Sequence, residues 1–324
     1  MKKLVLAILL AMLSPLAKGQ ATGSYRQSTM SPYSSGSSGG SNNYLFDNRY
    51  SDVFRYYRNT DGKFGTFTLR VVYNGSGSDR SVVVVKRDYE VSGARPLSKA
   101  IPDLASDGYV TSRPMRYARY RGSLLTPPDT AVVYRLPYSM SRPVVVEVST
   151  KTQEGVTRAD GSEVGRSRFT FTITKPDTVY AMRLGMVVEI NGTETASKKA
   201  ENISVTVEHP DKTLAYYDLP IGSVTLVKEG RTVYPGTPLA IAGNNDGSRP
   251  PLQYSVGVGH LISARKGEDN DYLTYEFIDP FFATTEGNVR LMDGKHIPVM
   301  NSSIATAEMS AREKRKYMAR LAYN

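Results

Sequence analysis

Few residues in this chain of 324 could bind a metal or act as a nucleophile. It contains no cysteine and only three histidines, His209, His260 and His296, which lie in separate segments. A catalytic zinc site needs three ligands from histidine, cysteinate or carboxylate, and it leaves a fourth position for water. The three histidines do not have ligand spacing, so no metal site is predicted from them.

The most regular part of the chain runs from Ile203 to Val258 and has the pattern of short strands joined by tight turns. Apolar residues alternate over 203–207, residues 209–212 favour a turn, and residues 213–219 favour a second strand. Glycine and proline then punctuate short apolar runs over 227–243. This pattern predicts a small β-barrel or β-sandwich.

This order of strands, turns and glycines resembles the LytM/lysostaphin-type zinc endopeptidases, which cut peptide cross-links in bacterial peptidoglycan. The glycine pattern of that family, Val-x-x-Gly-x-x-Val-x-x-Gly-x-x-Leu-Ala-x-x-Gly, is intact from Val227 to Gly243. Residues 168–190 resemble its upstream strands. The sequence Tyr134-Arg135-Leu136-Pro137-Tyr138 matches the Tyr-x-Leu-Pro-Tyr motif that opens the catalytic domain in the Bacteroidota branch. The resemblance covers residues 44–299 and is strongest from Tyr134 onward.

The family's metal ligands and catalytic histidines are replaced at the positions that match. Asp218 stands where the family reads Tyr-Ala-His-Leu, and Pro251 and Gln253 stand where it reads Pro-His-Leu-His. The metal-binding aspartate aligns with Thr172 or, with a different gap, with Thr170. The resemblance therefore implies a degenerate member without catalytic residues, bound metal or cofactor.

Loss of these residues would remove the chemistry along with the metal. Catalytic zinc lowers the pKa of its bound water to about 7 and polarises the scissile carbonyl, and the family's histidines handle protons and hold the oxyanion. Thr, Pro and Gln side chains do none of this. No histidine precedes His209 in the sequence, so the first zinc-binding histidine is missing in any alignment. In the family a histidine commonly ends this strand without binding zinc, so the resemblance implies a structural, hydrogen-bonding role for His209. We therefore expect an inactive homologue of a zinc metalloendopeptidase.

The substitutions also suggest what the former active-site strands could bind. Pro251 removes a backbone donor and stiffens its strand, and Gln253 keeps hydrogen-bonding groups without a charge. Tyrosines beside an uncharged amide suit a protein or glycan interface. We identify Tyr217, Asp218, Gln253 and Tyr254 as candidate binding residues of a groove. The alternative is that both tyrosines are ordinary core or surface residues.

The first residues have the pattern of an export signal. A basic start at Lys2 and Lys3 precedes an apolar run over 4–13 that is too short to span a bilayer, and 17–19 is a small-x-small cleavage site. We expect residues 1–19 to be a signal peptide cleaved near Gly19, and the mature chain to lie in the periplasm or at the outer membrane. It has no further apolar segment long enough for a membrane helix.

The mature chain divides into four parts. Residues 20–43, rich in glycine and serine, predict a flexible leader. Residues 44–130 predict an immunoglobulin-like β-sandwich, with a strand over 64–73, a turn over 74–77 and a strand over 81–85. Residues 131–300 form the degenerate LytM-like domain. Residues 301–324 predict a basic helix, capped by Ser302 or Ser303 and running from Ala305 to Ala322. The predicted fold class is all-β with a short C-terminal helix.

The charge of the chain bears on its partners. The formal net charge is +10, and loss of Lys2, Lys3 and Lys18 with the signal peptide lowers it by three, to +7. Arginine and tyrosine alternate over 113–121, which in a cytoplasmic protein would indicate nucleic acid. Behind a signal peptide we expect no nucleic acid, and instead a solvated strand face or an acidic protein or glycan partner.

These observations predict a non-catalytic pseudo-peptidase. We expect it to act as a structural or docking subunit of a cell-envelope complex, of the secretion or outer-membrane kind, in contact with an envelope protein complex, with peptidoglycan or with both. The alternatives are a regulator that activates a cell-wall amidase and, least favoured, an active peptidoglycan endopeptidase.

The first testable prediction concerns zinc. Because Thr172, Asp218, Pro251 and Gln253 replace the usual ligands, the purified protein should contain no stoichiometric zinc by elemental analysis. About one zinc per chain, lost in the Asp218→Ala variant, would contradict this prediction.

Overall fold

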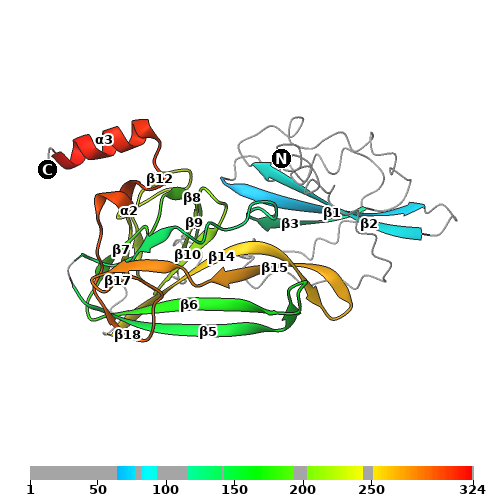
Figure 1. Ribbon diagram of the computed structural model, residues 1–324, viewed down its shortest axis with the longest axis horizontal. Helices are drawn as coiled ribbons and strands as arrows, with labels where there is room; N and C mark the ends of the chain where they lie inside the picture. The colour runs from blue at the N-terminus through cyan, green and yellow to red at the C-terminus, as the bar shows by residue number, and fades with distance from the viewer. Residues whose placement is uncertain are drawn as a thin grey trace, which may run out of the picture.

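The computed structural model describes residues 64–76, 82–92, 115–140, 142–192, 203–243 and 251–322 (Figure 1). These residues form strands throughout, with two short helices near the C-terminal end. The predicted all-β fold class is therefore confirmed. The predicted signal peptide and leader lie outside the described residues.

The described strands of the predicted first domain form a three-stranded antiparallel sheet. Its strands are β1 (Thr66–Ser76), β2 (Val82–Ser92) and β3 (Met115–Arg121), in the order β2-β1-β3. The hairpin expected from the sequence is present. However, residues 74–76 of the turn predicted over 74–77 belong to β1. Asn74 pairs with Val84, so β1 continues as a strand to Ser76. The described part of 44–130 forms this one sheet, and most of the remaining interval lies outside the described residues.

A nine-stranded sheet forms the centre of the second part (Figure 1). Its strand order is β12-β8-β9-β10-β14-β15-β6-β5-β18. The strands of this sheet are β5 (Val144–Thr157), β6 (Glu163–Ile173), β8 (Gly185–Asn191), β9 (Ile203–Glu208), β10 (Leu214–Leu219), β12 (Thr232–Val233), β14 (Leu252–Lys266), β15 (Asp269–Ile278) and β18 (Gly294–His296).

Two small sheets cover the core side of the central sheet. One has the order β11-β13-β7 and the other the order β17-β16-β4. Their strands are β4 (Val133–Arg135), β7 (Asp177–Tyr180), β11 (Val224–Thr225), β13 (Pro238–Ala242), β16 (Phe281–Thr284) and β17 (Gly287–Val289).

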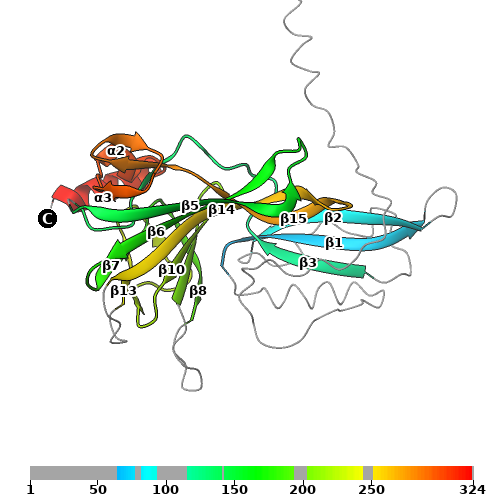
Figure 2. The same cartoon turned by 90° about the horizontal axis from the view of Figure 1, so that it is seen from below.

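Strand β14 is 15 residues long and pairs with several other strands of the central sheet along its length. Residues 252–256 pair with β6, residues 255–259 pair with β10, and residues 258–266 pair with β15. Figure 2 shows β14 and β15 reaching from the central sheet toward the N-terminal sheet.

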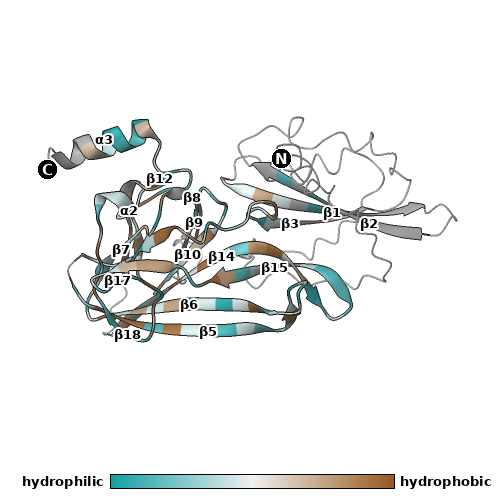
Figure 3. Ribbon diagram, viewed as in Figure 1, coloured by the Kyte–Doolittle hydropathy of each residue, from teal (hydrophilic) through white to brown (hydrophobic). Residues whose placement is uncertain are grey.

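The main core lies on one face of the central sheet, because every second residue of each strand points there. Alternating apolar and polar bands are visible along β5 and β6 in Figure 3. The buried aromatic side chains of this core are Tyr134, Tyr138, Phe169, Phe171, Tyr217, Tyr254 and Phe282.

Polar contacts hold the N-terminal sheet against the central sheet. The backbone N–H of Thr66 donates to the carboxylate of Glu208 at 2.6 Å, and the hydroxyl of Tyr275 donates to the carbonyl oxygen of Arg121 at 2.8 Å. The buried guanidinium of Arg70 pairs with Asp88 at 2.6 Å and with Asp271, at the tip of the β14–β15 hairpin, at 2.9 Å.

The C-terminal segment contains two helices where the sequence predicted one. Helix α2 (Ser302–Thr306) is capped by Asn301, whose side chain accepts from the N–H of Ile304 at 2.9 Å, and not by Ser302 or Ser303. Helix α3 (Ala311–Ala322) starts anew because Ser310 and Glu313 form a reciprocal capping box. Among the described residues, the helices are all too short or too polar to cross a membrane.

The packing of β8 on β9 gives the second testable prediction. A Cβ atom added at Gly185 would lie 2.6 Å from the carbonyl oxygen of Glu208 and 2.6 Å from Val207 Cγ1. The backbone oxygen cannot move without disturbing the β8–β9 ladder. Gly185→Ala should therefore lower the free energy of unfolding by about 2 kcal/mol or more, measured by urea denaturation.

Gly165→Ala is the matched control, because a Cβ atom there would meet its nearest neighbours at 3.7 and 3.8 Å. Its stability should stay within about 0.5 kcal/mol of the original protein. Equal effects of the two substitutions would contradict the proposed packing constraint.

Candidate functional site

The face of the central sheet opposite the main core carries most of the candidate site residues. We define the polar face by Thr170 and Thr172 on β6, Ser204 on β9, Asp218 on β10, and Gln253 and Ser255 on β14. Within it, Asp218 lies between Ser204 and Ser255, Ser255 lies beside Thr170, and Gln253 lies beside Thr172.

The structure thus brings together three of the four positions where the sequence resemblance placed lost ligands. Thr172, Asp218 and Gln253 come from adjacent strands, because β14 runs between β6 and β10 over residues 252–256. Pro251 is exposed and directly precedes β14. It therefore borders the polar face at the start of that strand.

Asp218 is held in place by an arginine. Its carboxylate forms an ion pair with Arg168 Nη2, and Arg168 Nε donates to the hydroxyl of Ser255 at 2.8 Å. Burial raises the pKa of Asp218, and the positive charge of Arg168 opposes that rise. The carboxylate, arginine and serine form a connected polar group on the sheet.

Gln253 is exposed, and its amide donates a long hydrogen bond of 3.4 Å to the hydroxyl of Thr172. The amide therefore keeps most of its hydrogen-bonding capacity for other partners. Among the described residues, histidines and carboxylates do not gather in a group of three that could hold a metal ion. The chemistry available on the polar face is hydrogen bonding.

Tyr217 and Tyr254 do not line the groove proposed for them. Their exposed fractions are 0% and 2%, because they alternate with the residues of the polar face and point into the main core. The hydroxyl of Tyr217 accepts from the N–H of Met182 at 3.0 Å. Tyr254 stacks on Phe171 at 5.1 Å, and its hydroxyl donates to the carbonyl oxygen of Pro137 at 3.0 Å. Both tyrosines are core residues, which was the alternative interpretation.

The sequence pattern also indicates that both tyrosines face the core. Tyr217 has the same parity as Ala215 and Leu219, and Tyr254 has the same parity as Leu252 and Val256. In a strand buried on one side, residues of one parity share a face. Of the four candidate binding residues, Asp218 and Gln253 therefore lie on the polar face.

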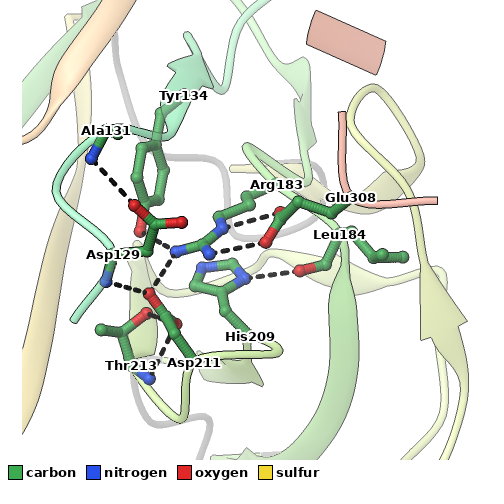
Figure 4. Close-up of polar contacts among 9 residues, drawn as sticks. All are labelled: Asp129, Ala131, Tyr134, Arg183, Leu184, His209, Asp211, Thr213 and Glu308. Carbon is green, nitrogen blue, oxygen red and sulfur yellow. Dashed lines mark hydrogen bonds and ion pairs between the residues drawn. The ribbon is translucent and has the colours of Figure 1, made fainter. Parts of the chain in front are cut away.

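A buried polar cluster around Arg183 was not identified from the sequence (Figure 4). Arg183 is 2% exposed. Its Nη1 donates to Asp211 and to the hydroxyl of Tyr134, both at 2.8 Å, while Nε and Nη2 donate to the two carboxylate oxygens of Glu308 at 2.8 and 2.6 Å. These partners come from three distant segments. Their contact had no local signal in the sequence.

His209 lies in the same cluster and has the structural role expected from the sequence. It is buried, its Nδ1 donates to the carbonyl oxygen of Leu184 at 2.8 Å, and its ring meets Tyr134 edge-on at 5.6 Å. Burial, together with the nearby charge of Arg183, lowers the pKa of His209 to about 3. The imidazole is therefore neutral at physiological pH.

The other two histidines lie elsewhere. His260 is next to Glu276, with Nε2 at 3.8 Å from the carboxylate, and burial lowers the pKa of His260 to about 4. His296 Nε2 bonds to the carbonyl oxygen of Met292 at 2.8 Å. Each histidine has a separate environment.

His209 generates the third testable prediction, on pH. The unfolded chain takes up a proton at this histidine below about pH 6.5, whereas the folded chain does so only near pH 3. The contribution of His209 to stability is therefore complete above pH 6.5 and decreases as the pH is lowered toward 3. Between pH 7.5 and 4.5, His209 should account for a loss of about 2 to 3 kcal/mol in the free energy of unfolding.

The His209→Asn variant tests this by urea denaturation at both pH values. Asparagine can donate to the carbonyl oxygen of Leu184 but does not titrate, so the drop between the two pH values should shrink by that amount. His260 contributes to both proteins and cancels in the comparison. An unchanged drop in His209→Asn would contradict the assignment.

The chain was compared with known proteins. No protein-family model matches it, and no curated protein matches it. Among solved structures, it is similar to Helicobacter pylori Csd3 in the orthorhombic crystal form, with 10% sequence identity and a TM-score of 0.30. That similarity covers 79% of this chain and 71% of the other. A TM-score of 0.30 does not establish a shared fold.

Proposed function

We propose that this protein is a non-catalytic relative of the LytM/lysostaphin-type peptidases that serves as a docking subunit of a bacterial cell-envelope complex and contacts peptidoglycan. One observation carries the proposal. The positions where that family keeps ligands and catalytic histidines correspond here to Thr172, Asp218 and Gln253, side by side on one sheet face and linked to hydrogen-bonding neighbours.

The polar face has the chemistry of a binding surface for glycan or peptide. Hydroxyl groups of Thr170, Thr172 and Ser255 and the amide of Gln253 can donate and accept hydrogen bonds without carrying charge. Arg168 fixes Asp218 and Ser255, which lowers the entropy cost of ordering them when a partner binds.

An apolar contact lies at the edge of the polar face. Val145 on β5 pairs with Thr172 across the strands, and 39% of its surface is exposed. A sugar ring or a small peptide side chain could pack on Val145 while its polar groups bond to Gln253 and Thr172. Apolar contact beside uncharged hydrogen-bonding groups is typical of specific interfaces.

The proposal also places the protein outside the cytoplasm, on the basis of the signal-like pattern over residues 1–19. Fractionation of cells should then recover the chain, shortened by cleavage near Gly19, with the periplasm or the outer membrane. Recovery of the uncleaved chain from the cytoplasm would contradict this part of the proposal.

The fourth testable prediction concerns the polar face. The double variant Thr172→Ala with Gln253→Ala should keep the original melting temperature but show about tenfold weaker retention on purified peptidoglycan sacculi. This corresponds to a loss of about 1.4 kcal/mol. The matched control is Thr150→Ala with Thr152→Ala, which removes two exposed threonine hydroxyls from β5 outside the polar face.

Three measurements separate the competing functions. Equal retention of both double variants would contradict the docking role of the polar face. Release of peptides from the sacculi by the original protein would show a peptidase. Stimulation of a purified cell-wall amidase without retention on sacculi would favour the regulatory alternative. Co-purification from membranes with mass spectrometry would identify the protein partner.

A further inference from the structure

Among the described residues, three arginines are almost completely buried, and they differ in their partners. Arg70, Arg135 and Arg183 are 3%, 3% and 2% exposed. Arg70 pairs with Asp88 and Asp271, and Arg183 pairs with Asp211 and Glu308. Arg135 forms no ion pair with the described carboxylates. Its buried positive charge is therefore not neutralised by a described acidic side chain.

Two of the three guanidinium nitrogens of Arg135 are unsatisfied. Nη2 donates to the carbonyl oxygen of Tyr138 at 3.0 Å, whereas Nε and Nη1 have no hydrogen-bond partner among the described residues. A buried donor without an acceptor is destabilising, and more so when it is charged. Native structures rarely leave such a group unsatisfied unless another molecule serves it.

Aromatic side chains surround this guanidinium. It lies over the ring of Tyr180, with 4.6 Å between the guanidinium carbon and the ring centroid. Burial lowers the pKa of Arg135, and the phenols of Tyr180, Tyr254, Tyr217 and Tyr317 oppose that shift. By contrast, carboxylates raise the pKa of Arg70 and of Arg183.

The structure leaves a small space beside Arg135 Nε. A Cβ atom built on Gly236 lies 3.4 Å from Met300 Cε and 3.8 Å from Arg135 Nε, which is ordinary van der Waals contact. A methyl-sized volume is therefore free at this point. Tyr180 and Tyr317 are both partly exposed, and Tyr317 belongs to α3 at the surface.

We propose that Arg135, which lies over the ring of Tyr180 and beside Gly236, is a binding site for a small oxyanion, a carboxylate or phosphate group. The oxyanion supplies the negative charge and the acceptor oxygens that Nε and Nη1 lack. The site lies on the core side of the central sheet, so it is separate from the polar face and does not depend on the function proposed for that face.

Calorimetric titration of the full chain with inorganic phosphate and, separately, with acetate tests the proposal at constant ionic strength. We expect saturable binding of one anion per chain, and the arm with the lower dissociation constant identifies the preferred group. At about ten times that constant, the anion should raise the melting temperature by about 3 °C relative to chloride.

Variants at three positions make the test specific. Arg135→Met should abolish anion binding and should itself be at least as stable as the original protein in chloride, because it removes an uncompensated buried charge. Arg135→Lys should bind more weakly, because an ammonium lacks the guanidinium donors. Met300→Ala should bind at least as tightly, because the shorter side chain enlarges the space between Gly236 and Arg135 Nε. The exposed Arg265→Met is the control and should bind like the original protein.

Two results would overturn the proposal. One is that neither anion binds the original protein, or that each binds Arg135→Met equally well. The other is that Arg135→Met is strongly destabilised in chloride, as expected if the guanidinium is already satisfied within the protein.

Discussion

One buried charge, the guanidinium of Arg183, links three distant segments of the chain. It joins the turn that carries Asp211, the strand that begins at Val133 and carries Tyr134, and the C-terminal segment that carries Glu308 (Figure 4). Removal of Arg183 would leave the carboxylates of Asp211 and Glu308 without this partner, and breaking a buried ion pair typically costs about 3 to 5 kcal/mol. His209 fits beside this group as a neutral ring, because it is buried and lies next to the positive charge of Arg183. The segment between α2 and α3 is attached to the rest of the protein through the ion pair of Glu308 with Arg183.

The sequence predicted the features that depend on local pattern. Alternation of apolar residues identified β9 and β10, and the histidine, proline and aspartate that follow β9 marked the tight turn between them. The same local reasoning misplaced the first turn, because Asn74 and Gly75 have turn character but pair with β2 as strand residues. It also merged two helices into one, because the helical period continues across Ser310, where a new capping box starts α3. Propensity is a weak guide where tertiary contacts decide the boundary.

The site was harder to predict, because it depends on which side of the sheet each residue faces. Asp218 and Gln253 lie on the polar face, but Tyr217 and Tyr254, each one residue away, lie in the core. The predicted set of binding residues therefore combined side chains from two opposite faces of one sheet. Arg168 and Arg183 escaped notice because their carboxylate partners lie 50, 28 and 125 residues away. Contacts over such separations are set by the topology, and a single sequence does not display them.

The long strand β14 also constrains the order in which the chain can fold. Until residues 252–256 are in place, β6 pairs with β5 on one edge and has no partner on the edge that β14 later occupies. The residues that close this edge lie far along the chain, since Gln253 is 81 residues after its neighbour Thr172. An unpaired strand edge attracts other strands, including those of other chains. Closure over long sequence separations is also slow. If the chain folds from its N-terminus, this edge of β6 therefore stays open until β14 pairs with it, and an open strand edge favours aggregation.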